Sequence, residues 1–73
     1  MLALSLSKGQ ALTGRQREVL ALMVEGLSNA EIAGRLSISL PTARFHVSQI
    51  LDKLGAANRA EATALAVKRR LVP

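Results

Sequence analysis

Hydrophobic residues recur three or four positions apart along the chain from residue 12 onward, and this spacing predicts amphipathic helices rather than strands. Four such segments are separated by short polar turns near residues 26, 38 and 56. Each segment follows a residue that can cap the amino end of a helix, and three of these caps precede Gln or Glu by three positions, as in a capping box. The caps are Thr13, Ser28, Ser39 and Asn58, and the box partners are Gln16, Glu31 and Glu61.

The third segment, about residues 40–54, shows the clearest division into an apolar and a polar face. Its start depends on Pro41, because a residue before proline avoids the helical region; either Ser39 or Leu40 is therefore expected to be the cap. The segment ends at Gly55. With about 100° between successive residues, the side chains that fall within roughly 60° of Val47 form the expected core face: Leu40, Ala43, Ile50, Leu51 and Leu54.

Composition agrees with a small helical domain. The 73 residues include no cysteine and a single aromatic residue, Phe45. The core must therefore come from aliphatic residues and alanine, and no disulfide or cysteine-bound metal can brace it. We predict an all-α fold, a compact four-helix domain over residues 12–73 that contains a helix-turn-helix, preceded by a flexible leader or linker remnant at residues 1–11.

Positive charge is concentrated in the second half of the chain. The formal net charge is +5, and residues 40–73 contribute six basic minus two acidic residues, or +4. This distribution indicates a polyanionic partner such as nucleic acid, or else a merely solvated surface. No apolar run approaches the ~18 residues of a membrane span, and the amino end lacks a signal peptide, so we expect a cytoplasmic protein without membrane contact.

The outward face of the third helix carries the candidate chemistry, because the early turns of a recognition helix enter the major groove of DNA. Arg44 can form a fork with guanine O6 and N7 or bind a phosphate. Phe45 points outward in this phase and suits a thymine methyl group; the alternative is that it folds back over the first two helices. For Ser48 and Gln49, which could reach base edges one turn further on, the alternative is an ordinary polar surface. The predicted contacts on this helix are Thr42, Arg44, Phe45, His46, Ser48 and Gln49.

His46 lies between the two faces of this helix. With one histidine and no cysteine in the chain, neither a metal site nor a histidine-based catalytic triad has support. The remaining interpretations are a packed histidine or a phosphate contact through a ring N–H. We therefore expect no metal, no cofactor and no enzymatic activity.

Four further residues are candidate phosphate contacts. Ser28 and Asn29 lie at the amino end of the second helix, where free N–H groups favour an anion, and in a helix-turn-helix this helix crosses the DNA backbone. Lys53 and Arg59 lie near the far end of the third helix. The alternatives are simple capping by Ser28, favourable charge at a helix end for Lys53 and a solvated position for Arg59.

The fourth helix, from Asn58 to about Arg70, has an apolar side made of small residues. A chain this short buries only about 60% of its unfolded surface and is marginally stable alone. We therefore expect this side to pair with a second copy of the chain, through Ala62, Leu65 and Ala66.

Four short motifs follow one another along residues 12–72 in a combination more specific than any one of them. They are Leu-Thr-x-Arg-x-x-Glu-Val-Leu at 12–20, Gly-Leu-Ser-Asn-x-Glu-Ile-Ala at 26–33, Thr42, Arg44, His46 and Val47 with Ile-x-x-Lys-Leu-Gly at 50–55, and Asn-Arg-x-Glu-Ala at 58–62. In this combination the chain resembles the LuxR-type helix-turn-helix, the DNA-binding output domain of many bacterial response regulators and quorum-sensing activators. It departs from the family pattern at Gly14, Gln16 and Ala43, where Pro, Glu and Val are common.

The resemblance implies sequence-specific binding of double-stranded DNA and regulation of transcription. It further implies a homodimer on an inverted repeat, with the fourth helix at the dimer contact, and RNA polymerase is a further candidate partner. Family members usually carry an amino-terminal receiver or ligand-sensing domain. Because 73 residues leave no room for one, we expect an excised output domain or a small stand-alone regulator.

Other functions remain open at this point. The promoter-reading helix-turn-helix of sigma factors shares the pattern. A different class is a helical dimerisation module that has lost DNA binding and modulates a partner regulator, but the basic and polar outer face of the third helix argues against it. An enzyme has the weakest support, since Asp52, Glu61 and His46 show no spacing that builds an acid–base pair.

Overall fold

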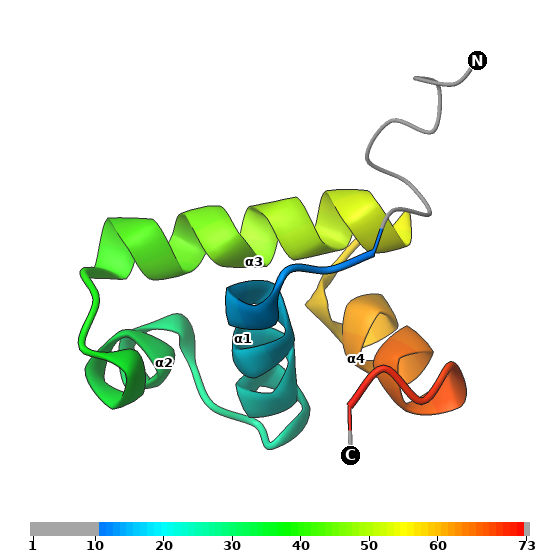
Figure 1. Ribbon diagram of the computed structural model, residues 1–73, viewed down its shortest axis with the longest axis horizontal. Helices are drawn as coiled ribbons and strands as arrows, with labels where there is room; N and C mark the ends of the chain where they lie inside the picture. Colours follow the sequence, from blue (N-terminus) through cyan, green and yellow to red (C-terminus); the bar gives the residue numbers. More distant parts are fainter. Residues whose placement is uncertain (1–10, 73) are drawn as a thin grey trace.

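The computed structural model describes residues 11–72, and this part of the chain contains four α-helices (Figure 1). They are α1 (Gly14–Val24), α2 (Asn29–Leu36), α3 (Leu40–Leu54) and α4 (Arg59–Lys68), and no strand occurs in this range. The predicted all-α fold is confirmed. The predicted leader lies outside the described residues except for Ala11.

The predicted caps are observed at all four helix starts. Thr13 and Ser28 form complete capping boxes with Gln16 and Glu31. Ser39 caps α3, so that Leu40 is already helical and the alternative cap at Leu40 is wrong.

The third predicted box is incomplete. Asn58 accepts a hydrogen bond from the Glu61 amide, but the Glu61 carboxylate accepts one from the amide of Ala57 instead of that of Asn58. The helix also ends two residues earlier than predicted, at Lys68, because Arg70 has a left-handed backbone with φ of 55° that cannot continue it.

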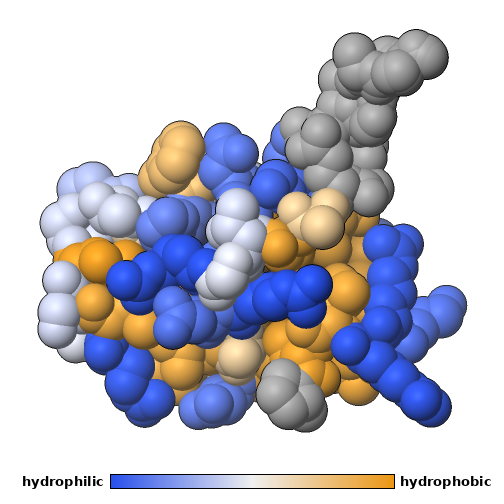
Figure 2. Space-filling model, in the orientation of Figure 1, coloured by the Kyte–Doolittle hydropathy of each residue, from blue (hydrophilic) through white to orange (hydrophobic). Residues whose placement is uncertain are grey.

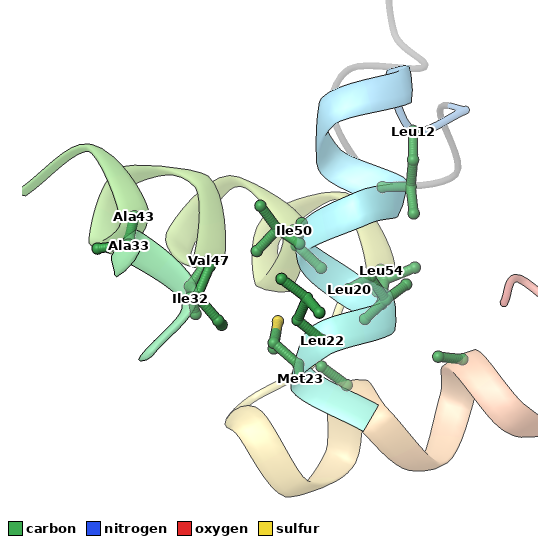
Figure 3. Close-up of a cluster of buried hydrophobic side chains, with 13 residues drawn as sticks. Leu12, Leu20, Leu22, Met23, Ile32, Ala33, Ala43, Val47, Ile50 and Leu54 are labelled. Carbon is green, nitrogen blue, oxygen red and sulfur yellow. The ribbon is translucent and has the colours of Figure 1, made fainter. Parts of the chain in front are cut away.

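The core lies where the four helices meet. Figure 3 shows the buried side chains of the core gathered between the helices, among them Leu20, Ile32 and Ile50, each of which is fully enclosed. The predicted core face of α3 is largely confirmed, with Leu40 and Leu51 only half-buried. The core residues from α3 are Ala43, Val47, Ile50 and Leu54.

Helix α4 requires a correction to the predicted dimer contact. Ala62 and Ala66 have no exposed surface, because they pack into the domain's own core, and Leu65 is half-buried against that core. The first two side chains are therefore not accessible to a second copy. The exposed large hydrophobic side chain of this helix is Val67, which is 60% exposed.

None of the helices in the described range combines the length and the apolar character that crossing a membrane requires.

Candidate nucleic-acid interface

The turn between α2 and α3 sets the angle of the helix-turn-helix. Ser37 ends α2 in a left-handed conformation with φ of 56°, and the amide of Ile38 then bonds to the Ala33 carbonyl at 3.0 Å. Ser39 starts α3 immediately, and its hydroxyl donates to the Thr42 hydroxyl at 2.9 Å. As a result α3 runs along one edge of the molecule, with the other three helices on its inner side (Figure 1).

The outer face of α3 is open to solvent, as its phase predicts. Arg44 and Ser48 are exposed, and Phe45 is 59% exposed rather than folded over the first two helices. His46 is half-buried beside it, with 6.1 Å between the two ring centroids. No acidic residue occurs on α3 before Asp52. The amino-terminal part of this face is therefore polar, cationic and free of negative charge; Thr42 is exposed there and Gln49 half-buried.

The amino end of α2 keeps donors for an anion. The Ser28 hydroxyl accepts from the Glu31 amide at 3.1 Å, and the Glu31 carboxylate accepts from the Ser28 amide at 2.7 Å. Within residues 11–72, the next two amides, those of Asn29 and Ala30, have no partner. Two N–H groups at a helix start therefore remain for a phosphate.

Arg59 joins the start of α4 to the start of α2. Its guanidinium donates to the Asn29 side-chain oxygen at 2.9 Å and to the Leu27 carbonyl. Because the oxygen of the Asn29 amide group accepts this bond, its NH₂ remains available to donate outward. The partners lie about 30 residues apart in the chain, so no local pattern could have paired them.

Lys53 has an internal role that the sequence did not indicate. Its ammonium group donates to the Gln16 side-chain oxygen at 2.9 Å and to the Ala11 carbonyl at 3.4 Å. Gln16 is buried, and the same oxygen accepts from the Thr13 amide. Lys53 therefore connects the end of α3 to the start of α1. Of the three N–H donors of its ammonium group, at most one remains available for a phosphate.

The carboxyl group of Glu31 titrates below its ordinary value. The hydrogen bonds from the Ser28 amide and hydroxyl lower its pKa from 4.5, and the positive charge of Arg35 lowers it further. A carboxylate with a lowered pKa stabilises the folded state above its ordinary pKa, and this contribution disappears as the pH falls through the lowered value.

We expect Glu31→Gln to be less stable than the parent at neutral pH, with a difference that shrinks below pH 4.5. Glutamine keeps the shape of the capping box but carries no titratable charge. Urea unfolding of both proteins between neutral and acidic pH measures the difference. A gap that stays constant across this range would show that the charge of Glu31 is irrelevant to the cap.

Comparison with known proteins shows the family to which the chain belongs. The family model of bacterial regulatory proteins, luxR family, matches residues 10–66, which cover α1 to α3 and most of α4. The chain belongs to the LuxR family. This membership confirms the predicted fold and the predicted class, DNA-binding regulation of transcription, and it does not favour a dimerisation module that has lost DNA binding.

Several curated regulators resemble this LuxR-family domain over most of its length. A probable transcriptional regulatory protein, SgaR of Hyphomicrobium methylovorum, is 47% identical over 58 residues, which are 80% of this chain and 28% of that protein. LiaR of Bacillus subtilis is 38% identical and the response regulator VraR of Staphylococcus aureus is 40% identical, each over 86% of this chain and 30% of its own length. The chain thus spans less than a third of these relatives.

Proposed function

We propose that this LuxR-family domain binds double-stranded DNA in a sequence-specific manner with the outer face of α3 in the major groove. The observation that carries the proposal is the open, cationic amino-terminal part of that face, on which Arg44, Phe45 and Ser48 project into solvent without a carboxylate between them. Arg44 has the fork geometry for guanine, and Phe45 offers an apolar surface for a thymine methyl group. Thr42 and Gln49 border these side chains and would reach the edges of the same base pairs.

The phosphate contacts in this proposal centre on the start of α2. The free amides of Asn29 and Ala30, the Ser28 cap and the Asn29 side chain held by Arg59 all belong to the start of this helix. Arg59 keeps further donors for the same phosphate, since only two of its five are used. His46 is a secondary phosphate contact, and Lys53 contributes mainly by holding α3 in place.

A homodimer on an inverted repeat is the second part of the proposal. Because Ala62 and Ala66 are buried, the contact must use the exposed side of α4, where the exposed Val67 follows the exposed Ala64 by three residues. Such a patch is small, so self-association should be weak without DNA.

Because the chromosome of bacteria lies in the cytoplasm, we expect a protein that binds it to act there. Contact with RNA polymerase remains a prediction.

The test of DNA binding is its dependence on salt. The logarithm of affinity for duplex DNA should fall linearly with the logarithm of salt concentration, with a slope of about −0.9 for each phosphate neutralised. Fluorescence anisotropy with a labelled duplex, selected from a random library, measures this slope. Absence of binding at low salt, or an affinity indifferent to salt, is incompatible with the proposal.

The dimer proposal predicts a dependence on half-site spacing. Half-sites about one helical turn apart, ~34 Å, should bind cooperatively, and inserting about five base pairs should abolish cooperativity by turning them to opposite sides of the duplex. Val67→Asp should weaken cooperative binding yet leave binding to a single half-site intact, since Val67 lies on α4, away from the groove-facing surface of α3. Equal affinity for both spacings would indicate a monomer.

A further inference from the structure

A hollow lies where the start of the described chain, the end of α3 and the segment after α4 meet. Its volume is about 270 Å³. Cationic and leucine side chains surround it, which distinguishes it from the all-apolar core. We call it the basic hollow, and it is lined by Ala11, Leu12, Arg17, Lys53, Leu54, Arg69 and Leu71.

Within residues 11–72, the cationic side chains of the basic hollow form no ion pair. Arg17 and Arg69 are exposed, and the ion pair found within residues 11–72 is Arg15 with Glu18, elsewhere on the surface. Lys53 bonds to neutral oxygens only.

The walls of the basic hollow are apolar as well as cationic. Of the leucines that line it, Leu12 and Leu54 are each 8% exposed and Leu71 is half-buried. Figure 2 shows apolar surface flanked by hydrophilic side chains at the end of the molecule where the described chain stops. An occupant that satisfies both parts must combine carboxylates with a large apolar side chain. Phosphates of DNA supply charge but nothing for the leucines.

The hollow is also separate from the proposed groove-facing surface. Lys53 lies nine residues beyond Arg44 on α3, or roughly 13 Å along the helix axis at ~1.5 Å per residue. Arg17 and Arg69 come from α1 and the end of α4, behind the face of α3 that is open for DNA. A second partner could therefore occupy the hollow while DNA is bound.

We propose that the basic hollow binds an acidic segment of a partner protein. A leucine-sized side chain of that segment packs against Leu12, Leu54 and Leu71, and flanking carboxylates pair with Arg17 and Arg69. The volume lies below the ~300–1,000 Å³ of pockets that enclose whole small ligands, which suits a few side chains of a peptide. The proposal is independent of the DNA-binding function, because it uses no residue of the groove-facing surface.

The experiment is a titration of the full ¹⁵N-labelled chain with synthetic peptides, followed by NMR. The probe is a capped peptide of alternating leucine and aspartate; one control replaces leucine by serine and the other replaces aspartate by asparagine. We expect saturable shifts of the Arg17, Leu54 and Leu71 amides with the first peptide, and at least fivefold weaker binding of both controls. If the serine peptide shifts these amides as strongly as the leucine peptide does, then the leucine side chain does not contribute to binding. The hollow would be only a general cationic surface, and the proposal would be overturned.

Matched variants test the same site. The double variant Arg17→Gln with Arg69→Gln should lower the affinity for the leucine–aspartate peptide at least fivefold. The control double variant Arg35→Gln with Lys68→Gln removes the same charge from exposed positions outside the hollow, and it should change that affinity less than twofold. Equal losses in both pairs, or no shifts at ~1 mM peptide, the weak limit of specific association, would refute the proposal. So would duplex DNA that shifts these amides when the peptide does not.

Discussion

Arg44→Ala should relax the base preference of the domain at a single position of its operator. Arg44 is exposed on the amino-terminal part of α3, where a recognition helix meets the base edges. A bidentate pair with guanine contributes about 1–3 kcal/mol of discrimination, so the preference for that base should fall roughly five- to 150-fold. A competition panel of single-base operator variants, measured for the parent and the variant, locates the affected position.

The control for this prediction is Arg35→Ala. Arg35 carries the same charge and is exposed, but it lies in the last turn of α2, outside the outer face of α3. We expect this variant to lower all affinities alike, to a small extent, with the base preferences intact. If Arg44→Ala behaves in the same way, then Arg44 binds a phosphate, and sequence readout must come from Phe45, Ser48 and Gln49.

The helices could be predicted closely because their signals are local. Thr13 and Ser28 select the starts of α1 and α2 by hydrogen bonds that span three residues. The outward phase of Phe45 followed from helical geometry alone, although a lone aromatic residue is usually buried. The third helix and its polar outer face could therefore be predicted from the sequence.

Long-range pairings set the limit of prediction. Lys53 and Gln16 are about 37 residues apart, and the bond between them gives Lys53 a structural contact that no local pattern indicates. Its contact with a phosphate stays a prediction. Ala62 and Ala66 illustrate a second limit: small apolar residues fit equally a dimer contact and the domain's own core. Only the packing of α4 against the other helices distinguishes these alternatives.

The same reasoning changes the expectation for Lys53. From the sequence, Lys53→Ala would weaken all DNA sequences alike and flatten the salt slope by about one unit. The structure shows both hydrogen bonds of its ammonium group directed into the domain. The first consequence of the substitution should therefore be a looser contact between α3 and α1, and loss of DNA affinity would follow from it.

Arg59→Ala should lower both stability and DNA affinity, because Arg59 fastens α4 to the start of α2. The variant loses the bonds to Asn29 and to the Leu27 carbonyl. Hydrogen bonds to charged groups contribute ~1.5–3 kcal/mol each, and partial exposure reduces this, so we expect a loss of about 1.5–3 kcal/mol in the free energy of unfolding. The free energy of unfolding of native proteins is roughly 0.05–0.15 kcal/mol per residue, so this loss is a large share of the total stability of the domain. Urea unfolding without DNA measures it.

A double-mutant cycle with Asn29→Ala separates the function of Arg59 from its structural role. If Arg59 acts on DNA by orienting the Asn29 side chain toward a phosphate, then removing either residue should remove most of the same affinity. The two losses, measured where every variant is folded, should then fail to add by at least ~0.5 kcal/mol. Losses that add within ~0.3 kcal/mol would mean that the two residues bind DNA independently. Arg59→Lys provides the matched control: it keeps the charge but cannot hold the Leu27 carbonyl and the Asn29 oxygen with one planar fork, so it should recover little of either property.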